Sequence, residues 1–126
     1  MFRFFDLLGR SSAMNALDDA FRAFGVHPML VPDPVKLTVM QLYKTQVAAL
    51  GRKAAFAQAA QLLAYCILGH EQFASNNGMD IADQTEHRVD EAITDGASRD
   101  AKLILLAVHS GLIAPEIADL VDVDDD

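Results

Sequence analysis

Cys66 and His70 lie four residues apart, so in a helix their side chains share one face. A cysteine and a histidine placed in this way can form a thiolate–imidazolium pair or supply two ligands to a metal ion. Glu71 follows directly, and His70 with Glu71 can act as a proton-transfer pair. Cys66, His70 and Glu71 are therefore the candidate ligand-binding residues. The competing interpretation makes Cys66 a small core residue and lets His70 pack or cap a helix end.

A second group of possible ligands, Asp83, His87 and Glu91, repeats every four residues. Three ligands in a row along one helix cannot surround a metal ion, so another helix would have to contribute. No Glu-x-x-His pair, the usual source of ligands in metal-binding helical bundles, occurs in the sequence. A solvated acidic face is the preferred interpretation. The sequence therefore predicts no metal site, no cofactor and no transition metal that copurifies with the protein.

The sequence contains no familiar catalytic motif. The glycine-rich phosphate-binding patterns, the nucleophile elbow G-x-S-x-G and the zinc-protease pattern H-E-x-x-H are all missing. Gly25, Gly78, Gly96 and Gly111 instead fall where helices are expected to end. We predict no catalytic residue and favour a protein that is not an enzyme.

Residues 111–121, GLIAPEIADLV, are similar to the first helix of a helix-turn-helix, in which G-L-x-x-x-E-I-A precedes a turn and a recognition helix. After residue 123 only three aspartates follow, so the sequence offers no recognition helix. An acidic end would also repel phosphates. We expect residues 111–121 to form a packing helix and expect no nucleic-acid partner.

Charge is distributed unevenly along a chain whose net charge is −8. Residues 1–53 contain seven Lys and Arg against four Asp, a net charge of +3, whereas residues 54–126 have a net charge of −11. Two copies can therefore pair head to tail, or the acidic part can meet a basic protein partner. The alternative is an acidic surface that only keeps the protein soluble. We predict self-association, most simply as a homodimer.

The first ten residues are the second candidate contact surface. Phe2, Phe4 and Phe5 stand between Arg3 and Arg10 in a short amphipathic segment. This segment can dock on its own bundle, on a second copy or, least favoured, on a membrane surface. Phe2, Phe4 and Phe5 are therefore the candidate interaction residues.

The periodicity of apolar residues predicts an all-α fold without strands. We expect a compact bundle of five to six helices around a central, alanine-rich, apolar helix at about residues 53–75. Its most apolar run, residues 54–69, is short for a membrane span. A helix capped by Ser11 or Ser12 should end at Gly25, and another should run from Asp33 to about Leu50. Residues 1–126 form a single domain, with a short N-terminal segment (1–10) and a frayed acidic tail (122–126).

These features predict a small acidic cytoplasmic protein that acts through protein contacts as an adaptor, regulator or subunit. The cytoplasmic assignment follows from a single cysteine and from a start without a signal peptide. The first alternative is a ligand- or metal-binding bundle with a site near Cys66, His70 and Glu71. The second alternative is an enzyme that uses His70 and Glu71 for proton transfer.

Overall fold

The chain folds into helices over residues 2–121, the part that this computed structural model describes; side chains are described for residues 12–120. Helices account for 83% of the chain, and the described residues contain no strand, which confirms the predicted all-α fold class. In chain order the elements are α1 (Phe2–Ala23), the 3-10 helix η1 (Pro28–Leu30), α2 (Asp33–Leu42), α3 (Lys44–Leu50), α4 (Arg52–Leu68), α5 (His70–Asn77), α6 (Met79–Thr94), α7 (Arg99–His109) and α8 (Pro115–Val121).

The expected helix at residues 53–75 is two helices, because the chain breaks at Gly69. Gly69 has a φ of +85°, in the region that only glycine adopts easily. A Cβ atom at this position would also collide with the Glu116 carboxylate on α8. The break turns α5 away from α4 and makes His70 the first residue of α5.

Two other helix boundaries differ from the sequence-based expectation. The predicted helix from Asp33 to Leu50 is divided at Tyr43 into α2 and α3. At the other end of the chain, α1 begins at Phe2, so Ser11 and Ser12 lie inside it and cap nothing. Residues 2–10 thus lie in the same helix as residues 11–23, since no proline interrupts α1.

Helix α4 packs against α1, α3, α5, α6 and α7. It is buried on nearly every side because its sequence is apolar almost all round. Its fully buried alanines (Ala55, Ala59, Ala60 and Ala64) leave room for neighbouring helices to approach closely. Large side chains from the neighbours, such as Phe21, Phe73 and Leu103, complete the core.

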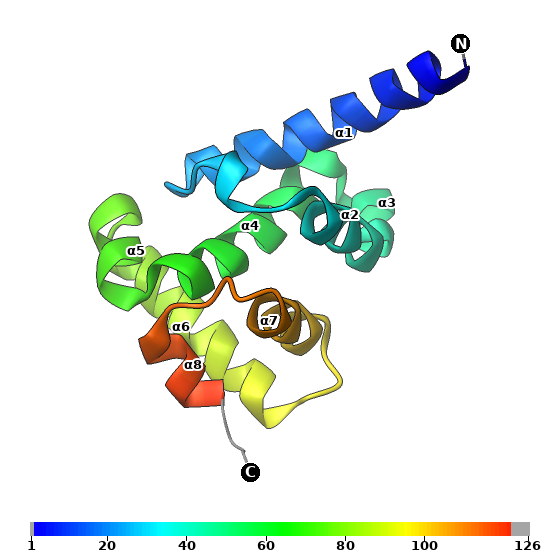
Figure 1. Cartoon of the computed structure of the whole chain (residues 1–126). Coiled ribbons are helices and arrows are strands. Elements are labelled where there is room, and N and C mark those ends of the chain that lie inside the picture. The colour runs from blue at the N-terminus through cyan, green and yellow to red at the C-terminus, as the bar shows by residue number, and fades with distance from the viewer. Residues whose placement is uncertain (1, 122–126) are drawn as a thin grey trace.

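Figure 1 shows that α1, α2 and α3 lie on one side of α4, whereas α5 to α8 lie on the other. The basic part of the sequence ends near the start of α4, so the charge asymmetry of the sequence is also an asymmetry in space. Within the described part of the chain, no helix has both the length and the apolar character that crossing a bilayer demands.

Candidate functional site

Cys66 is a core residue with no solvent exposure. Burial raises the pKa of its thiol to about 12, although Arg88 acts in the opposite direction. A thiol in this state is neither a good nucleophile nor a ready metal ligand at neutral pH. The Gly69 break also removes the regular helical spacing that was expected to align Cys66 with His70. The structure therefore favours the packing interpretation of Cys66.

Glu71 and His70 face different surroundings, although they are neighbours in sequence. Glu71 is exposed and lines a polar hollow together with Gln72, Ser75 and Glu116. No described metal-ligating cluster includes Glu71. The structure thus does not bring the three candidate residues Cys66, His70 and Glu71 together.

His70 is held in place by Tyr65 from the last turn of α4. The Tyr65 hydroxyl lies 2.8 Å from Nδ1 of His70, and the two rings meet edge to face at 5.7 Å. Tyr65 is itself fixed, because it is buried and packs edge to face on Phe73 at 5.3 Å. The side chain of His70 stays 31% exposed, so solvent reaches part of it.

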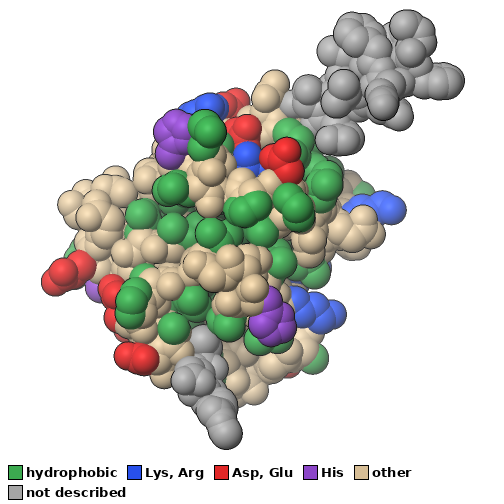
Figure 2. Space-filling model, in the orientation of Figure 1, with side chains coloured by type: hydrophobic (Ala, Val, Ile, Leu, Met, Phe, Trp, Pro, Cys, Tyr) green, Lys and Arg blue, Asp and Glu red, His purple; other side chains and the backbone are tan. Residues whose placement is uncertain are grey.

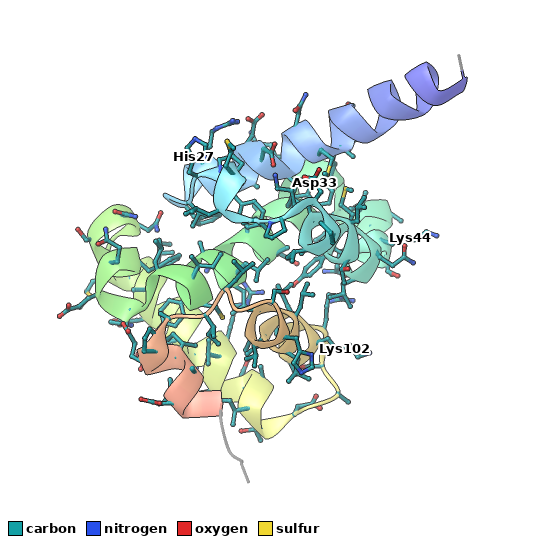
Figure 3. The ribbon with its side chains drawn as sticks, viewed as in Figure 1. His27, Asp33, Lys44 and Lys102 are labelled. Carbon is teal, nitrogen blue, oxygen red and sulfur yellow. The ribbon has the colours of Figure 1, made fainter. Side chains whose placement is uncertain are left out.

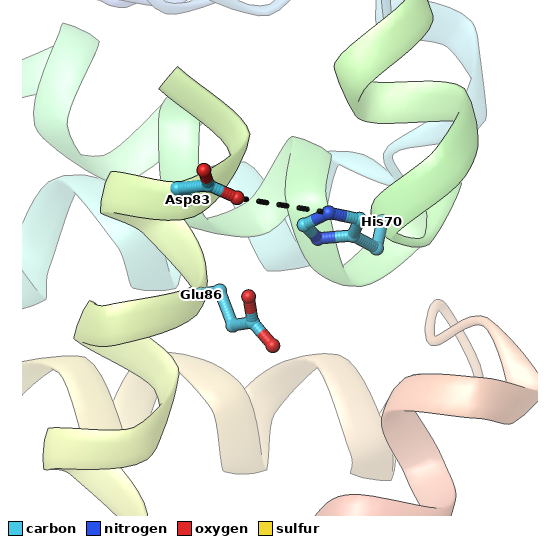
Figure 4. A group of neighbouring side chains, drawn as sticks. All are labelled: His70, Asp83 and Glu86. Carbon is cyan, nitrogen blue, oxygen red and sulfur yellow. Dashed lines mark ion pairs between the residues drawn. The ribbon is translucent and has the colours of Figure 1, made fainter. Parts of the chain in front are cut away.

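The imidazole of His70 lies near two carboxylates on α6, those of Asp83 and Glu86. Its Nε2 lies 4.0 Å from Oδ1 of Asp83, and one ligand atom from each of the three residues falls within 4.8 Å of the others. Figure 4 shows the imidazole of α5 and the carboxylates of α6 grouped around the gap between the two helices. We call these three residues the His70 cluster.

The row of possible ligands Asp83, His87 and Glu91 is divided in the structure, because only Asp83 belongs to the His70 cluster. His87 pairs with Glu91 at 3.2 Å on an exposed surface, and neither belongs to the His70 cluster. Asp83 and Glu86 are three residues apart and share a helix face, which is a signal that the sequence did contain. What it did not reveal is that the short connection at Gly78 brings α5 alongside α6.

The surroundings of the His70 cluster are strongly acidic. Burial raises the pKa of Tyr65, and the carboxylates of Glu86, Asp90 and Asp83 raise it further, so the phenol stays protonated. Among residues 12–120, no Lys or Arg lies within ion-pair distance of Asp83 or Glu86. The cluster is therefore an uncompensated negative region with one imidazole at its edge.

A second polar group, centred on Arg88, connects α4, α6 and α7 with Tyr43, the residue between α2 and α3. Its guanidinium donates two hydrogen bonds to Asp100, with Nε 3.0 Å from Oδ2 and Nη2 2.9 Å from Oδ1, and a third bond to the Gln58 carbonyl. The hydroxyl of Tyr43 donates to the same carboxylate at 3.3 Å, and burial raises the pKa of Tyr43 to about 12. Because its polar groups satisfy one another, this network is structural.

An apolar groove opens between α6, α7 and α8 on the acidic side of the molecule. It is a hollow of about 240 Å³ lined by Ala92, Ile93, Gly96, Ala101, Ile104, Leu105 and Leu120. Ile93, Leu105 and Leu120 are 46%, 50% and 48% exposed, which is unusual for neighbouring large apolar side chains. A polar hollow adjoins the groove at Ala92 and contains Asp90, Glu91 and Asp95, which we call the acidic rim.

A basic surface lies at the junction of α3 and α4. Leu50 is 49% exposed there, and Arg52 and Lys53 follow as exposed residues at the start of α4. We call Leu50, Arg52 and Lys53 the basic corner. Lys44 of α3 and Lys102 of α7 point outward on one side of the molecule (Figure 3). Figure 2 shows Lys and Arg side chains along this edge and Asp and Glu side chains along the opposite lower edge.

The chain matches no family model, no curated protein and no solved structure. The predicted interaction residues Phe2, Phe4 and Phe5 lie outside the described side chains. Among the described residues, the surface features that can support a function are the groove, the acidic rim, the basic corner and the His70 cluster.

Proposed function

We propose that this chain is a small cytoplasmic helical domain, organised around α4, that acts through protein contacts as an adaptor, regulator or subunit. Its first partner is a second copy of itself. The observation that carries the proposal is the apolar groove, where three large side chains stand about half exposed beside the acidic rim. Exposed apolar patches of this kind, bordered by polar residues, are typical of contact surfaces.

The occupant of the groove is the basic corner of the partner copy. Leu50 offers an apolar side chain to the groove, while Arg52 and Lys53 offer positive charge to the acidic rim. The chain's own last five residues, DVDDD, carry four carboxylates and are electrostatically unsuited to an acidic rim. Charge complementarity therefore favours a second copy over the chain's own tail.

The placement of these charges within their helices supports the same proposal. Arg52 and Lys53 occupy the first turn of α4, where the helix dipole disfavours positive charge. Glu91 lies in the last turn of α6 and Asp95 follows it, where the dipole disfavours negative charge. Both sets weaken their own helices slightly, which supports a role in an intermolecular contact, although Arg52 also donates a hydrogen bond to the Ser12 hydroxyl on α1 at 3.2 Å.

A reciprocal arrangement limits the assembly to two chains. Each copy then offers its groove to the corner of the other, and the two contacts are related by a two-fold axis. This geometry also lets two chains of net charge −8 associate, because each contact pairs opposite charges.

The experiment is light scattering on the full chain at low and high salt, with paired variants. Leu105→Lys introduces a charge into the groove and should weaken the dimer at least tenfold. Leu37→Lys is the matched control, because Leu37 is 42% exposed on α2, away from both surfaces. A wild-type monomer at both salt concentrations would disprove the proposal. A dimer that depends on Phe4 and Phe5 but not on Leu105 would also disprove it.

A further inference from the structure

We infer that His70, Asp83 and Glu86 form a binding site for a divalent transition-metal ion, with Zn²⁺ as the best fit. This inference goes beyond protein contacts, and it uses none of the residues of the groove or the basic corner. It also revises the sequence-based expectation of no metal site. That expectation rested on ligands lying in one row along a helix, and the structure instead supplies ligands from α5 and α6.

The three donor atoms lie within 4.8 Å of one another, so small side-chain rotations can bring them to a common ion. Zn²⁺ binds imidazole nitrogen and carboxylate oxygen at about 2.0–2.2 Å, which places tetrahedral ligands about 3.4 Å apart. The separation of 4.0 Å between Nε2 of His70 and Oδ1 of Asp83 is close to this value. The side chain of Asp83 is 66% exposed, so a small rotation can close the remaining gap without disturbing the core.

Tyr65 positions the imidazole for coordination. Its hydroxyl lies 2.8 Å from Nδ1 of His70 and can accept a hydrogen bond from Nδ1–H, which leaves the lone pair of Nε2 directed toward the carboxylates. Histidine ligands commonly have their second ring nitrogen held in this way. Because Tyr65 is buried, this orientation does not depend on a mobile surface group.

The charge of the site favours a divalent cation. Two carboxylates lie beside the imidazole of His70, and no Lys or Arg among residues 12–120 pairs with either carboxylate. One nitrogen and two oxygen ligands suit Zn²⁺ better than Ca²⁺ or Mg²⁺, which prefer oxygen ligands throughout. Three protein ligands leave one coordination position for water or for a group from a partner.

The test is isothermal titration of the metal-free full chain with ZnCl₂. We expect one Zn²⁺ per chain with a dissociation constant in the micromolar range. His70→Ala should weaken binding by about tenfold or more, and Tyr65→Phe, which leaves all three ligands in place, should weaken it by about tenfold. His87→Ala is the matched control, since His87 also lies beside a carboxylate on α6 but outside the cluster.

A second ligand variant guards against misfolding. Asp83→Asn changes an exposed side chain without changing its size, so it should keep the helical circular dichroism of the wild type and still weaken Zn²⁺ binding about tenfold. Absence of stoichiometric binding at a zinc concentration tenfold above that of the protein would overturn the inference. Binding that is lost with His87→Ala but kept with His70→Ala and Asp83→Asn would overturn it as well.

Discussion

The hydroxyl of Tyr65 lies 2.8 Å from Nδ1 of His70, although Gly69 interrupts the helix between the two residues. Residues five apart in a continuous helix do not face each other as neighbours three or four apart do. The break at Gly69 is therefore what brings this tyrosine and this histidine together. It also directs the free ring nitrogen of His70 toward α6, so the geometry of the His70 cluster depends on one glycine.

Gly69→Ala should destabilise the protein more than Gly51→Ala does. Both glycines have similar φ values, +85° and +92°. Holding an alanine in this backbone region should lower the free energy of unfolding by about 1–3 kcal/mol in each variant. Only at Gly69 does the new methyl group also meet the Glu116 carboxylate, whereas the space at Gly51 is open. Urea unfolding of the two variants measures the difference. Equal losses of unfolding free energy would show that the contact with Glu116 is unimportant.

Removing either partner of the Arg88–Asp100 pair should be clearly destabilising. Their side chains are only 23% and 26% exposed, and the remaining partner would keep a partly buried charge. We expect Asp100→Asn and Arg88→Met to lower the free energy of unfolding by about 1–3 kcal/mol. Asp19→Asn is the control, because its partner Arg22 is 58% exposed and such surface pairs contribute under about 1 kcal/mol. If thermal unfolding shows that Asp19→Asn costs as much stability as Asp100→Asn or Arg88→Met, the Arg88 network is not structural.

Stability should fall with rising pH in the alkaline range. Burial raises the pKa of Tyr43 from 10.0 to about 12 and that of Cys66 from 9.0 to about 12. Between these values the unfolded chain has already lost protons that the folded chain retains, so the free energy of unfolding decreases as pH rises. We expect little change from these groups below about pH 9 and a progressive loss from there to about pH 12.

Single substitutions test whether Tyr43 and Cys66 cause this loss of stability at alkaline pH. Tyr43→Phe removes the titrating hydroxyl and should flatten the slope of unfolding free energy against pH above about pH 10. Cys66→Ala should flatten the part that begins near pH 9. Either substitution also changes the unfolding free energy at every pH. The quantity to compare is therefore the slope of the unfolding free energy against pH, not its value at one pH. Unchanged slopes in both variants would mean that other groups cause the alkaline loss.

Some helix ends follow from local sequence signals. Gly25 ends α1 with a φ of +91°, and its backbone N–H bonds to the Arg22 carbonyl, as expected for a glycine after a helix. Ser98 caps α7, since its hydroxyl accepts a hydrogen bond from the amide of Ala101 at 3.1 Å. Such caps depend on residues within one turn, so the sequence alone contains them.

The features that sequence analysis missed depend on distant residues. A glycine inside an apolar helical pattern can be tolerated, so the pattern alone did not predict that the helix ends at Gly69, where φ is +85°. Cys66 and His70 were expected to share a face because the helix was expected to continue. The His70 cluster needed the packing of α5 on α6, which helical periodicity does not predict. The groove likewise arises where three separate helices meet.

The central claim, that the basic corner of one copy binds the groove of the other, is tested most directly by exchanging charges. One variant carries Glu91→Lys and Asp95→Lys in the acidic rim, and the other carries Arg52→Glu and Lys53→Glu in the basic corner. The new lysines lie at the C-terminal end of α6 and the new glutamates at the N-terminal end of α4, where the helix dipole favours these charges. Neither set of substitutions should therefore unfold the chain. Thermal unfolding of each variant checks this expectation.

Sedimentation velocity of the two variants, separately and mixed, is the decisive measurement. Alone, each variant presents like charges at both reciprocal contacts, so each should sediment as a monomer. In the mixture every contact again pairs opposite charges, so a heterodimer should form with the sedimentation coefficient of the wild-type dimer. Variants that each dimerise like the wild type, or a mixture that stays monomeric while the wild type dimerises, would contradict the proposed contact.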